Sequence, residues 1–387
     1  MVYVLIPAHN NKSEVLEILK CLEIQSYKNI KIVLVDDGST DNTGQEVKRF
    51  FPNVVVLRGN GRLWWTGANV KGVDCILEGA REGDFILLLN NDLLVKEDYV
   101  ERLVNASISN GRGIVGSTLV DFNNSDFMES GIRLDYRLNL VVNRNKTIIE
   151  ETELDMTTDV LPGRGTLIPQ EVFKKIGTFN LKKLPHYGAD YEFMIRAKRA
   201  GFKLMVSHRA KVFAKLNITG LNVPNKRFLT LKESLALLFS KRSKTNIRYY
   251  LNYIWLCSEK NHRVINVIYN FANILANTLF KTVYFFFFYL TLSSILRFLF
   301  KAYPFRISDI ERYGINLKEL EEAGIVEEGR FIGKRLYFLT PEVDIWIKTL
   351  DFDRKNRILQ LKRLSHSYIH KLSIVKEELN LLIYRGR

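Results

Sequence analysis

Short apolar runs that end in polar clusters recur through the first hundred residues. Such runs stand at residues 1–6, 32–35, 54–57 and 85–89, and a helical pattern occupies about 13–25. Apolar runs of this length are typical of strands that are buried on both faces of a parallel sheet. Their alternation with helical segments predicts βαβ units with right-handed crossovers. We therefore expect an α/β fold with a Rossmann-like, mostly parallel sheet.

Beyond residue 112 the pattern changes. Strand-like runs at 113–120 and 133–143 alternate with turn-rich stretches, and a glycine-bracketed turn at 163–169 leads through a strand into a helix at Gln170. Within 231–300, leucine, isoleucine and tyrosine residues recur at helical spacing, which predicts helices there. A helix at 309–323 followed by a hairpin at 325–338 suggests a winged-helix-like module, and basic amphipathic helices are expected at 351–387. These changes divide the chain into 1–225, a helical region at 226–304 and a small α/β or helical module at 305–387.

The net charge of +15 is concentrated in the later part of the chain. Between Lys241 and Arg306 there are ten Lys or Arg residues and one acidic residue, Glu259. Basic residues beside apolar runs suit an anionic membrane surface, where each charge contributes about 1 kcal/mol. Nucleic acid is the rival partner, but the apolar neighbours favour lipid, so no nucleic acid is expected.

The uncharged segment 282–296 bears on the membrane question. Its fifteen residues fall short of the roughly 20 that a spanning helix needs. We interpret it as an interfacial or shallowly inserted helix; a true span and a buried helix of a tail domain are the alternatives. No secretory signal pattern precedes the first strand. The expected location is therefore the cytoplasmic side of a membrane, peripheral or monotopic.

Carboxylates and amides follow the predicted strands directly. Asp36 and Asp37 come at the end of the second strand, Gly38 permits a tight turn there, and Asn91 and Asp92 follow the fourth strand. Ligands of open α/β sheets bind at the carboxyl ends of the strands. Fixed carboxylates accept hydrogen bonds from the N–H and O–H groups of a base or a ribose. The sequence therefore predicts a nucleotide site at this edge; a helix cap and an acidic surface loop are the alternative.

Four motifs, in this order, resemble family 2 glycosyltransferases of the GT-A fold. They are Val4-Leu-Ile-Pro-Ala-His-Asn10, Val35-Asp-Asp-Gly-Ser-Thr-Asp-Asn42, Asn90-Asn-Asp92 and Tyr187-Gly-Ala-Asp-Tyr-Glu-Phe193 with Arg196. The resemblance covers about 1–225 and implies a nucleotide-sugar-binding half at 1–112 and an acceptor half at 113–225. The Asn-Asn-Asp form and the segment 59–69 look most like bacterial rhamnosyltransferases of surface polysaccharide synthesis.

The resemblance assigns the donor side to the strand ends. Asp36 and Asp37 are implied to bind the nucleoside. Pro7, Ala8 and His9 would form a wall of the pocket. For His9, a helix-capping or hydrogen-bonded structural role is the alternative. Small residues around Trp64 and Trp65 let the chain approach the nucleotide sugar closely, and aromatic faces stack on pyranose rings; core packing is equally open for this pair. The remaining donor candidates are Gly38, Asn60, Arg62, Asn91 and Asp92.

Asp92 is also the candidate metal ligand, because the resemblance maps the acidic GT-A motif onto it. One carboxylate with substrate phosphates suffices for Mg²⁺ or Mn²⁺, whereas capping a helix near Lys96 is the alternative. The family's later histidine ligand is missing from 210–214, and His208 lies upstream. Basic side chains are the other means of offsetting diphosphate charge, namely those of Arg62, Arg164, Lys211 and Lys215.

The resemblance places the catalytic base at Asp190. In this chain Ala189 replaces the first acidic residue of the family motif. Burial near Tyr187 and Tyr191 would raise the pKa of Asp190 toward that of an effective base; a plain N-cap is the alternative. The acceptor or sugar candidates are Trp64, Arg164, Gly165, His186, Tyr187, Glu192 and Arg196, the last of which pairs with a carboxylate or approaches the diphosphate.

These residues predict an inverting glycosyltransferase that moves a hexose or deoxyhexose, rhamnose being one candidate. The donor is a nucleotide diphosphate sugar, and the acceptor is a glycan, expected to be lipid-linked. A nucleotidyltransferase and a catalytically silent nucleotide-sugar-binding or scaffold protein are the alternatives. The departures from the family motifs at Ala189 and at 210–214 are the basis of the silent-protein alternative.

Overall fold

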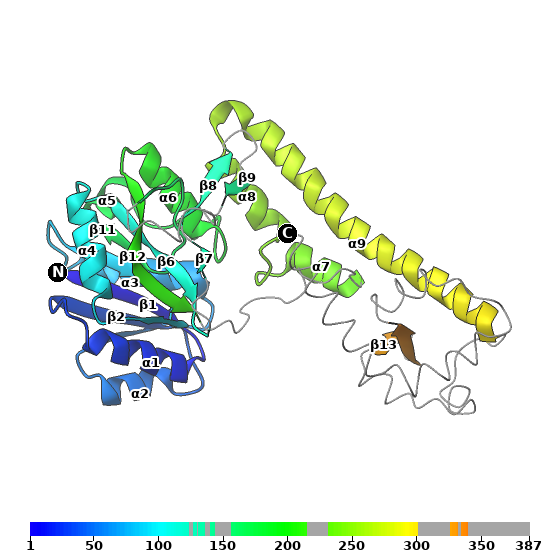
Figure 1. The fold of residues 1–387 in the computed structure, drawn as a ribbon, viewed down its shortest axis with the longest axis horizontal. Coiled ribbons are helices and arrows are strands. Elements are labelled where there is room, and N and C mark those ends of the chain that lie inside the picture. The colour runs from blue at the N-terminus through cyan, green and yellow to red at the C-terminus, as the bar shows by residue number, and fades with distance from the viewer. Residues whose placement is uncertain are drawn as a thin grey trace. The chain divides into compact units, whose positions relative to one another are not determined.

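A computed structural model describes residues 1–123, 127–129, 131–135, 140–143, 156–214, 231–300, 326–331 and 334–339. The chain forms two compact units, Met1–Phe286 and Phe287–Arg387. The first unit contains a ten-stranded sheet and the helices packed on it (Figure 1).

The first half of the sheet is the predicted βαβ alternation. Its elements are β1 (Val2–Ala8), α1 (Lys12–Glu23), β2 (Ile30–Asp36), α2 (Thr43–Phe50), β3 (Val55–Arg58), α3 (Trp64–Leu77) and β4 (Phe85–Leu88). The strands pair in the order β4-β1-β2-β3, all in parallel. Ala8 stands opposite Asp36 in the register, so the ends of β1 and β2 coincide. The strands and helices expected here are confirmed.

The second half makes the sheet mixed. Its elements are β5 (Leu93–Val95), α4 (Tyr99–Ser109), β6 (Ile114–Asp121), β7 (Phe127–Glu129), β8 (Arg133–Asp135), β9 (Leu140–Asn143), β10 (Met156–Thr157), β11 (Thr166–Pro169), α5 (Gln170–Ile176), α6 (Ala189–Arg199) and β12 (Leu204–Ala214). Strand β11 lies between β4 and β6 and is antiparallel to both. The sheet is therefore mixed: β4 and β6 run in the same direction, and β11 enters between them in the opposite direction.

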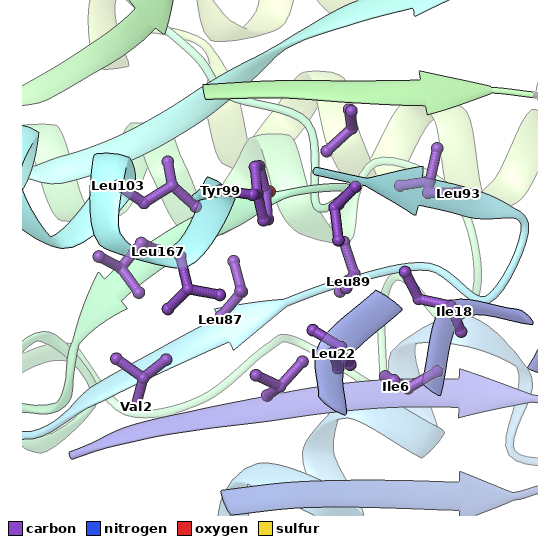
Figure 2. Packing of buried hydrophobic residues seen from close by; sticks show 14 of the residues in the cluster. Val2, Ile6, Ile18, Leu22, Leu87, Leu89, Leu93, Tyr99, Leu103 and Leu167 are labelled. Atoms are coloured by element: carbon purple, nitrogen blue, oxygen red, sulfur yellow. The ribbon is translucent and has the colours of Figure 1, made fainter. Parts of the chain in front are cut away.

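Both faces of the sheet are buried. Val2, Val4 and Ile6 of β1 pack in one hydrophobic cluster with α1, whereas Tyr3 and Leu5 pack in a second cluster with α3. This division follows from the alternation of side chains along a strand. Figure 2 shows Ile6, Ile18 and Leu22 together within the first cluster. The strands that bear the polar motifs are thus packed between two hydrophobic clusters, one on each face of the sheet.

Helices follow the sheet, as predicted for 231–300. They are α7 (Leu231–Phe239), α8 (Ile247–Cys257), the 3₁₀ turn η2 (Lys260–His262) and α9 (Arg263–Phe300). Within the described part of the chain, no helix has the length and apolar character needed to cross a bilayer. The predicted interfacial segment 282–296 lies inside α9, where only the backbone is described beyond residue 282.

A hairpin of β13 (Val326–Phe331) and β14 (Lys334–Leu339) forms an antiparallel pair in the second unit. It confirms the hairpin predicted at 325–338. The predicted helices at 309–323 and 351–387 lie outside the described residues.

Candidate active site

The loops after β1 and β2 are joined by hydrogen bonds. His9 Nδ1 donates to the carbonyl of Asp37 (2.7 Å), and the amide N–H of Asp37 donates to the carbonyl of Ala8 (2.8 Å). The Thr40 N–H donates to Asn10 Oδ1 (2.8 Å). The structure therefore brings Pro7, Ala8 and His9 beside the acidic pair, as the predicted pocket requires, and gives His9 a structural hydrogen bond as well.

The acidic pair itself organises the neighbouring loops. Both carboxylates are buried. Asp37 Oδ1 accepts from the Gly61 N–H (2.8 Å), and its Oδ2 accepts from the N–H groups of Leu63 (2.9 Å) and Trp64 (3.1 Å). Asp36 Oδ1 accepts from the Ser39 N–H (2.9 Å). Asp37 thus fixes the loop that leads into α3, a role that the sequence did not indicate.

Close backbone approach explains the glycines of these loops. Gly38 has a φ of +68°, and a Cβ there would lie 2.7 Å from the Gly61 nitrogen. Asn60 and Arg62 are exposed on the same loop, where the Arg62 N–H donates to Asn60 Oδ1 (3.0 Å). The donor candidates at 38 and at 60–62 are therefore neighbours in space.

The two tryptophans differ in environment. Trp64 has a φ of +56°, an uncommon conformation for a bulky residue, and its ring lies 5.2 Å from that of His186. Trp65 donates from Nε1 to Asn90 Oδ1 (3.2 Å) and packs edge-on against Phe179 at 5.5 Å. Trp65 is packed against the core cluster of α3. Core packing thus applies to Trp65, while Trp64 stands beside an acceptor candidate.

Asp92 is a partly buried carboxylate at the end of β4. Its Oδ1 is buried and has no hydrogen-bond partner among the described residues, and the same holds for Nδ2 of Asn91. Burial raises the pKa of Asp92, and the positive charge of Arg164 opposes this shift. Strand β5 follows directly, and the next helix begins at Tyr99. The alternative of an N-cap near Lys96 is therefore wrong.

Asp190 is the second residue of α6, whose N-cap is Gly188. The plain N-cap alternative is therefore wrong as well. Its Oδ2 accepts from the Gly163 N–H (2.9 Å) and its Oδ1 from the Tyr191 N–H (2.9 Å). Burial raises the pKa of Asp190, while these hydrogen bonds and the charge of Arg164 oppose the rise. Arg164 thus acts electrostatically on both Asp92 and Asp190.

The turn that bears Arg164 is tightly packed. Gly165 has a φ of +75°, and a Cβ there would lie 2.8 Å from both the Ser117 and the Tyr99 hydroxyl oxygens. At Gly163, a Cβ would overlap the Trp65 ring and lie 3.2 Å from the Asp190 Cβ. The two glycines predicted the turn from the sequence, but the sequence did not indicate which side chains pack against them.

His186 and Tyr187 lie on the loop before α6, with ring centroids 4.1 Å apart. Burial lowers the pKa of His186 to about 4 and raises that of Tyr187. The Lys244 Nζ lies 5.9 Å from the centroid of the Tyr187 ring. The predicted acceptor residues Trp64, His186 and Tyr187 therefore form one aromatic group.

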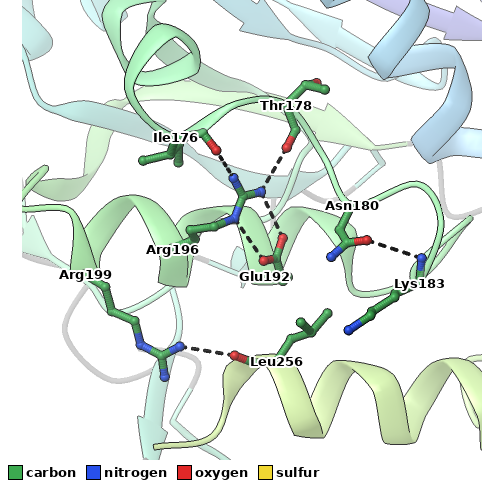
Figure 3. A network of polar contacts seen from close by, with 8 residues as sticks. All are labelled: Ile176, Thr178, Asn180, Lys183, Glu192, Arg196, Arg199 and Leu256. Atoms are coloured by element: carbon green, nitrogen blue, oxygen red, sulfur yellow. Dashed lines mark hydrogen bonds and ion pairs between the residues drawn. The ribbon is translucent and has the colours of Figure 1, made fainter.

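Glu192 and Arg196 hold a loop together (Figure 3). Arg196 donates to both oxygens of Glu192 (2.9 and 3.1 Å) and to the carbonyls of Ile176 and Thr178. The carboxylate partner foreseen for Arg196 is thus Glu192, which is 6% exposed. This geometry gives both residues a structural role and no contact that points to an acceptor.

The histidine and lysine candidates of β12 differ in their exposure to solvent. His208 is buried beside Thr118, with Nδ1 and Oγ1 3.3 Å apart, and Lys211 is exposed. Lys215 lies outside the described residues. Among the residues that the structure describes, no three His, Cys, Asp or Glu side chains cluster as a metal site. Asp92, with its buried acceptor oxygen, fits a hard cation as a single protein ligand.

Comparisons with known proteins find sequence similarity over part of this chain. Residues 3–177 match the model of the family described as "Glycosyl transferase family 2". "Glycosyltransferase GlyG" of Streptococcus pneumoniae serotype 4 is 28% identical over 129 residues, covering 33% of this chain and 41% of that protein. An "Uncharacterized glycosyltransferase" of Haemophilus influenzae is 23% identical over 256 residues, covering 64% of this chain and 90% of that protein.

The match spans only 41% of GlyG and 18% of the pneumococcal "Glycosyltransferase GlyA". A crystal structure of GalNAc-T7 with UDP, GalNAc and Mn²⁺ aligns with a TM-score of 0.47 at 14% identity, covering 77% of this chain and 57% of that one. Residues 3–177 are therefore similar to family 2 glycosyltransferases, the family that the sequence motifs resemble. The matched residues end before α6, so Asp190 lies beyond them.

Proposed function

We propose that this chain, whose residues 3–177 match glycosyltransferase family 2, is an inverting glycosyltransferase. It would move a hexose or deoxyhexose from a nucleotide diphosphate sugar to a glycan acceptor. The observation that supports this best is the environment of Asp190, a carboxylate whose pKa is raised by burial and which is hydrogen-bonded to the 163–165 turn. That turn contacts the end of β4, where the Gly165 N–H donates to the carbonyl of Leu88 (2.8 Å), shortly before Asn91 and Asp92.

Asp190 is the proposed general base. A raised pKa strengthens the carboxylate as a proton acceptor near neutral pH. The acceptor hydroxyl gives its proton to Asp190 while its oxygen bonds to the anomeric carbon, and the bond from that carbon to the diphosphate oxygen breaks. The nucleoside diphosphate leaves with the electron pair. One displacement by one base inverts the anomeric configuration.

The leaving diphosphate needs positive charge. The positive charge of Arg164 acts on the carboxylates of both Asp92 and Asp190, so Arg164 is one proposed source of the positive charge. A divalent cation held by Asp92 is the other and, when bound, would neutralise the charge that develops on the diphosphate. The unpartnered Oδ1 of Asp92 supports this assignment.

The donor and pathway belong to the same proposal. The resemblance of the Asn90-Asn91-Asp92 and 59–69 segments to rhamnosyltransferases favours a deoxyhexose and a role in bacterial surface polysaccharide synthesis. A nucleoside would lie over the loops that Asp36 and Asp37 organise. The aromatic group of Trp64, His186 and Tyr187 offers ring faces for the sugar or the acceptor.

A lipid-linked acceptor would place the enzyme at the cytoplasmic face of the inner membrane. The described part of α9 supports this placement, because several of its large apolar side chains are exposed, among them Val264, Ile268 and Leu279. Helix α9 contains no Asp or Glu over its 38 residues. An exposed apolar helix without acidic residues suits an anionic lipid surface.

The test is the release of nucleoside diphosphate by the full-length chain. We would incubate it with dTDP-, UDP- and GDP-sugars and extracted lipid-linked glycans, in Mg²⁺, in Mn²⁺ and in EDTA. One donor should give nucleoside diphosphate, and Asp190→Asn should slow its release by about 10²- to 10⁴-fold, the usual contribution of a general base. Loss of release in EDTA and in Asp92→Asn would identify the cation and its ligand.

Asp98→Asn is the matched control, because that carboxylate is 39% exposed and pairs with Arg102 on the surface. Release of pyrophosphate instead would indicate a nucleotidyltransferase. Donor binding by calorimetry without any product would favour the silent binding protein. Full activity of Asp190→Asn would remove Asp190 from the mechanism.

A further inference from the structure

Helix α8 packs against the segment that bears Asp190. The guanidinium of Arg199, on α6, donates to the carbonyl of Leu256 (3.1 Å; Figure 3). It also donates to the carbonyl of Cys257 at the end of α8. Asn252 Nδ2 donates to the carbonyl of Lys183 (3.1 Å), on the loop before α6. Helix α8 is thus fastened to both α6 and the loop that precedes it.

The apolar side of α8 continues the core of the sheet unit. Cys257 is fully buried and belongs to the same cluster as Ala189 and Phe193 of α6. Tyr253 and Leu256 pack against that cluster. Since the family match ends at residue 177, α8 lies outside the matched residues and yet shares their core.

Tyr253 meets the backbone at the start of α6. Gly188, the N-cap of α6, has a φ of +79°, and a Cβ there would lie 3.1 Å from Cδ2 and 3.4 Å from Cγ of the Tyr253 ring. Asp190 follows two residues later. The flat ring therefore lies directly against the turn that sets the position of the carboxylate.

The ring of Tyr253 is itself held in place. It lies 6.5 Å from the ring of Tyr191 and 6.3 Å from that of Tyr250, measured between centroids. The hydroxyl of Tyr250 donates to Asn270 Oδ1 of α9 (3.1 Å). Burial is the main cause that raises the pKa of Tyr253, and the charge of Asp190 raises it further, so the phenol stays neutral beside the carboxylate.

We propose that Tyr253 is a positioning residue for Asp190, supplied by a helix outside the matched glycosyltransferase residues. Its ring holds the Gly188 turn and keeps water away from the carboxylate. This inference rests on the proposed role of Asp190 as the base. It makes α8 a part of the catalytic unit.

The test uses Tyr253→Phe and Tyr253→Ala in the full-length chain. Phe keeps the ring against Gly188, so we expect kcat within about threefold of the parent. Ala removes the ring, and displacement of the base by about 1 Å should lower kcat about 10- to 100-fold with little change in donor affinity. Water that reaches Asp190 should also lower its pKa, so the acidic limb of the kcat profile should move to lower pH.

Trp255→Ala is the matched control, an aromatic residue of the same helix that is 43% exposed and stacks on Arg263. It should leave kcat and the pH profile unchanged. Thermal unfolding and donor calorimetry verify that each variant is folded. If Tyr253→Ala does not fold, Tyr253→Leu replaces it, since Leu fills much of the volume without a flat ring.

Two outcomes would overturn the inference. One is an unchanged kcat and pH profile in the folded Ala or Leu variant. The other is a Phe variant as impaired as Ala, which would mean that the hydroxyl acts directly. If Asp190→Asn is inactive while Tyr253→Ala is normal, only this inference fails. If Asp190→Asn is fully active, the proposed base fails first.

Discussion

At the residue scale, the pair of Glu192 and Arg196 illustrates a buried charge that depends on one partner. The Glu192 side chain is 7% exposed and that of Arg196 is 30% exposed. Arg196→Leu would leave the carboxylate buried and unpaired, so we expect a loss of about 3 kcal/mol in the free energy of unfolding. Urea denaturation measures it.

The double variant Glu192→Leu with Arg196→Leu provides the control. Removing both charges leaves no unpaired ion, so its loss should be smaller than the sum of the two single losses. Simple additivity of the three values would show that the pair does not act as described.

His186 makes stability depend on pH. Burial lowers its pKa to about 4 from an ordinary value of 6.5. Between these values the unfolded chain takes up a proton that the folded chain refuses, so the contribution of His186 is fully present above pH 6.5 and is lost as the pH falls toward 4. The loss should approach about 3 kcal/mol.

His186→Phe keeps a ring between Trp64 and Tyr187 but cannot titrate. Its free energy of unfolding should therefore fall less than that of the parent between pH 7 and pH 4. Parallel curves for His186→Phe and the parent would contradict the prediction.

The residues of the candidate site were foreseen to different degrees. The chain order of strand and motif was enough to place Asp36, Asp37 and Asp92 at one sheet edge, because parallel strands end on the same side. The sequence could not reveal that Asp37 accepts hydrogen bonds from residues 61, 63 and 64, since these contacts span 24 to 27 positions. The contact of Tyr253 with Gly188 is likewise tertiary.

At the element scale, the βαβ half was predictable and the mixed half was not. Apolar runs joined by helices specify parallel neighbours, as in β1, β2 and β4. Strand β11 has only four residues, Thr166–Pro169, and its direction depends on where the preceding loops lead. Local pattern contains no information on that path. The mixed sheet therefore follows from tertiary contacts of β11 with β4 and β6.

The packing of α8 predicts how the chain tolerates truncation. A chain that ends at residue 230 loses Tyr253, Leu256 and Cys257 from the core cluster. Each buried apolar side chain contributes about 1.5–3 kcal/mol, so we expect a loss of at least about 3 kcal/mol in the free energy of unfolding. A chain that ends at residue 286 keeps these contacts and should be more stable than the shorter chain. Thermal unfolding of the three chains distinguishes the cases, and equal stability of the shortest one would exclude α8 from the core.

At the scale of the whole molecule, charge and apolar exposure coincide along the helical region. Between Lys241 and Arg306 there are ten Lys or Arg residues and one acidic residue. Val264, Ile268, Leu275 and Leu279 recur at helical spacing on α9 and are between 37% and 64% exposed. Residues at i, i+4, i+11 and i+15 share one face of a helix. The sequence directed attention to 282–296, whereas this apolar face precedes that segment.

This face yields the prediction for membrane binding. Ile268→Glu with Leu279→Glu puts two negative charges where two apolar side chains would enter the interface. We expect binding to phosphatidylcholine vesicles with 30% phosphatidylglycerol to weaken at least about 100-fold, since the two lost side chains together remove about 3–6 kcal/mol of burial. Recovery of the parent should fall in high salt and on vesicles without anionic lipid, because the basic residues are then screened or unmatched.

Phe50→Glu with Ile108→Glu is the matched control, at residues that are 54% and 56% exposed on α2 and α4. This pair changes the net charge equally but away from α9, so it should bind as the parent does. Equal loss in both pairs would mean that net charge alone governs binding, and unchanged recovery of the α9 pair would show that this face does not meet the membrane.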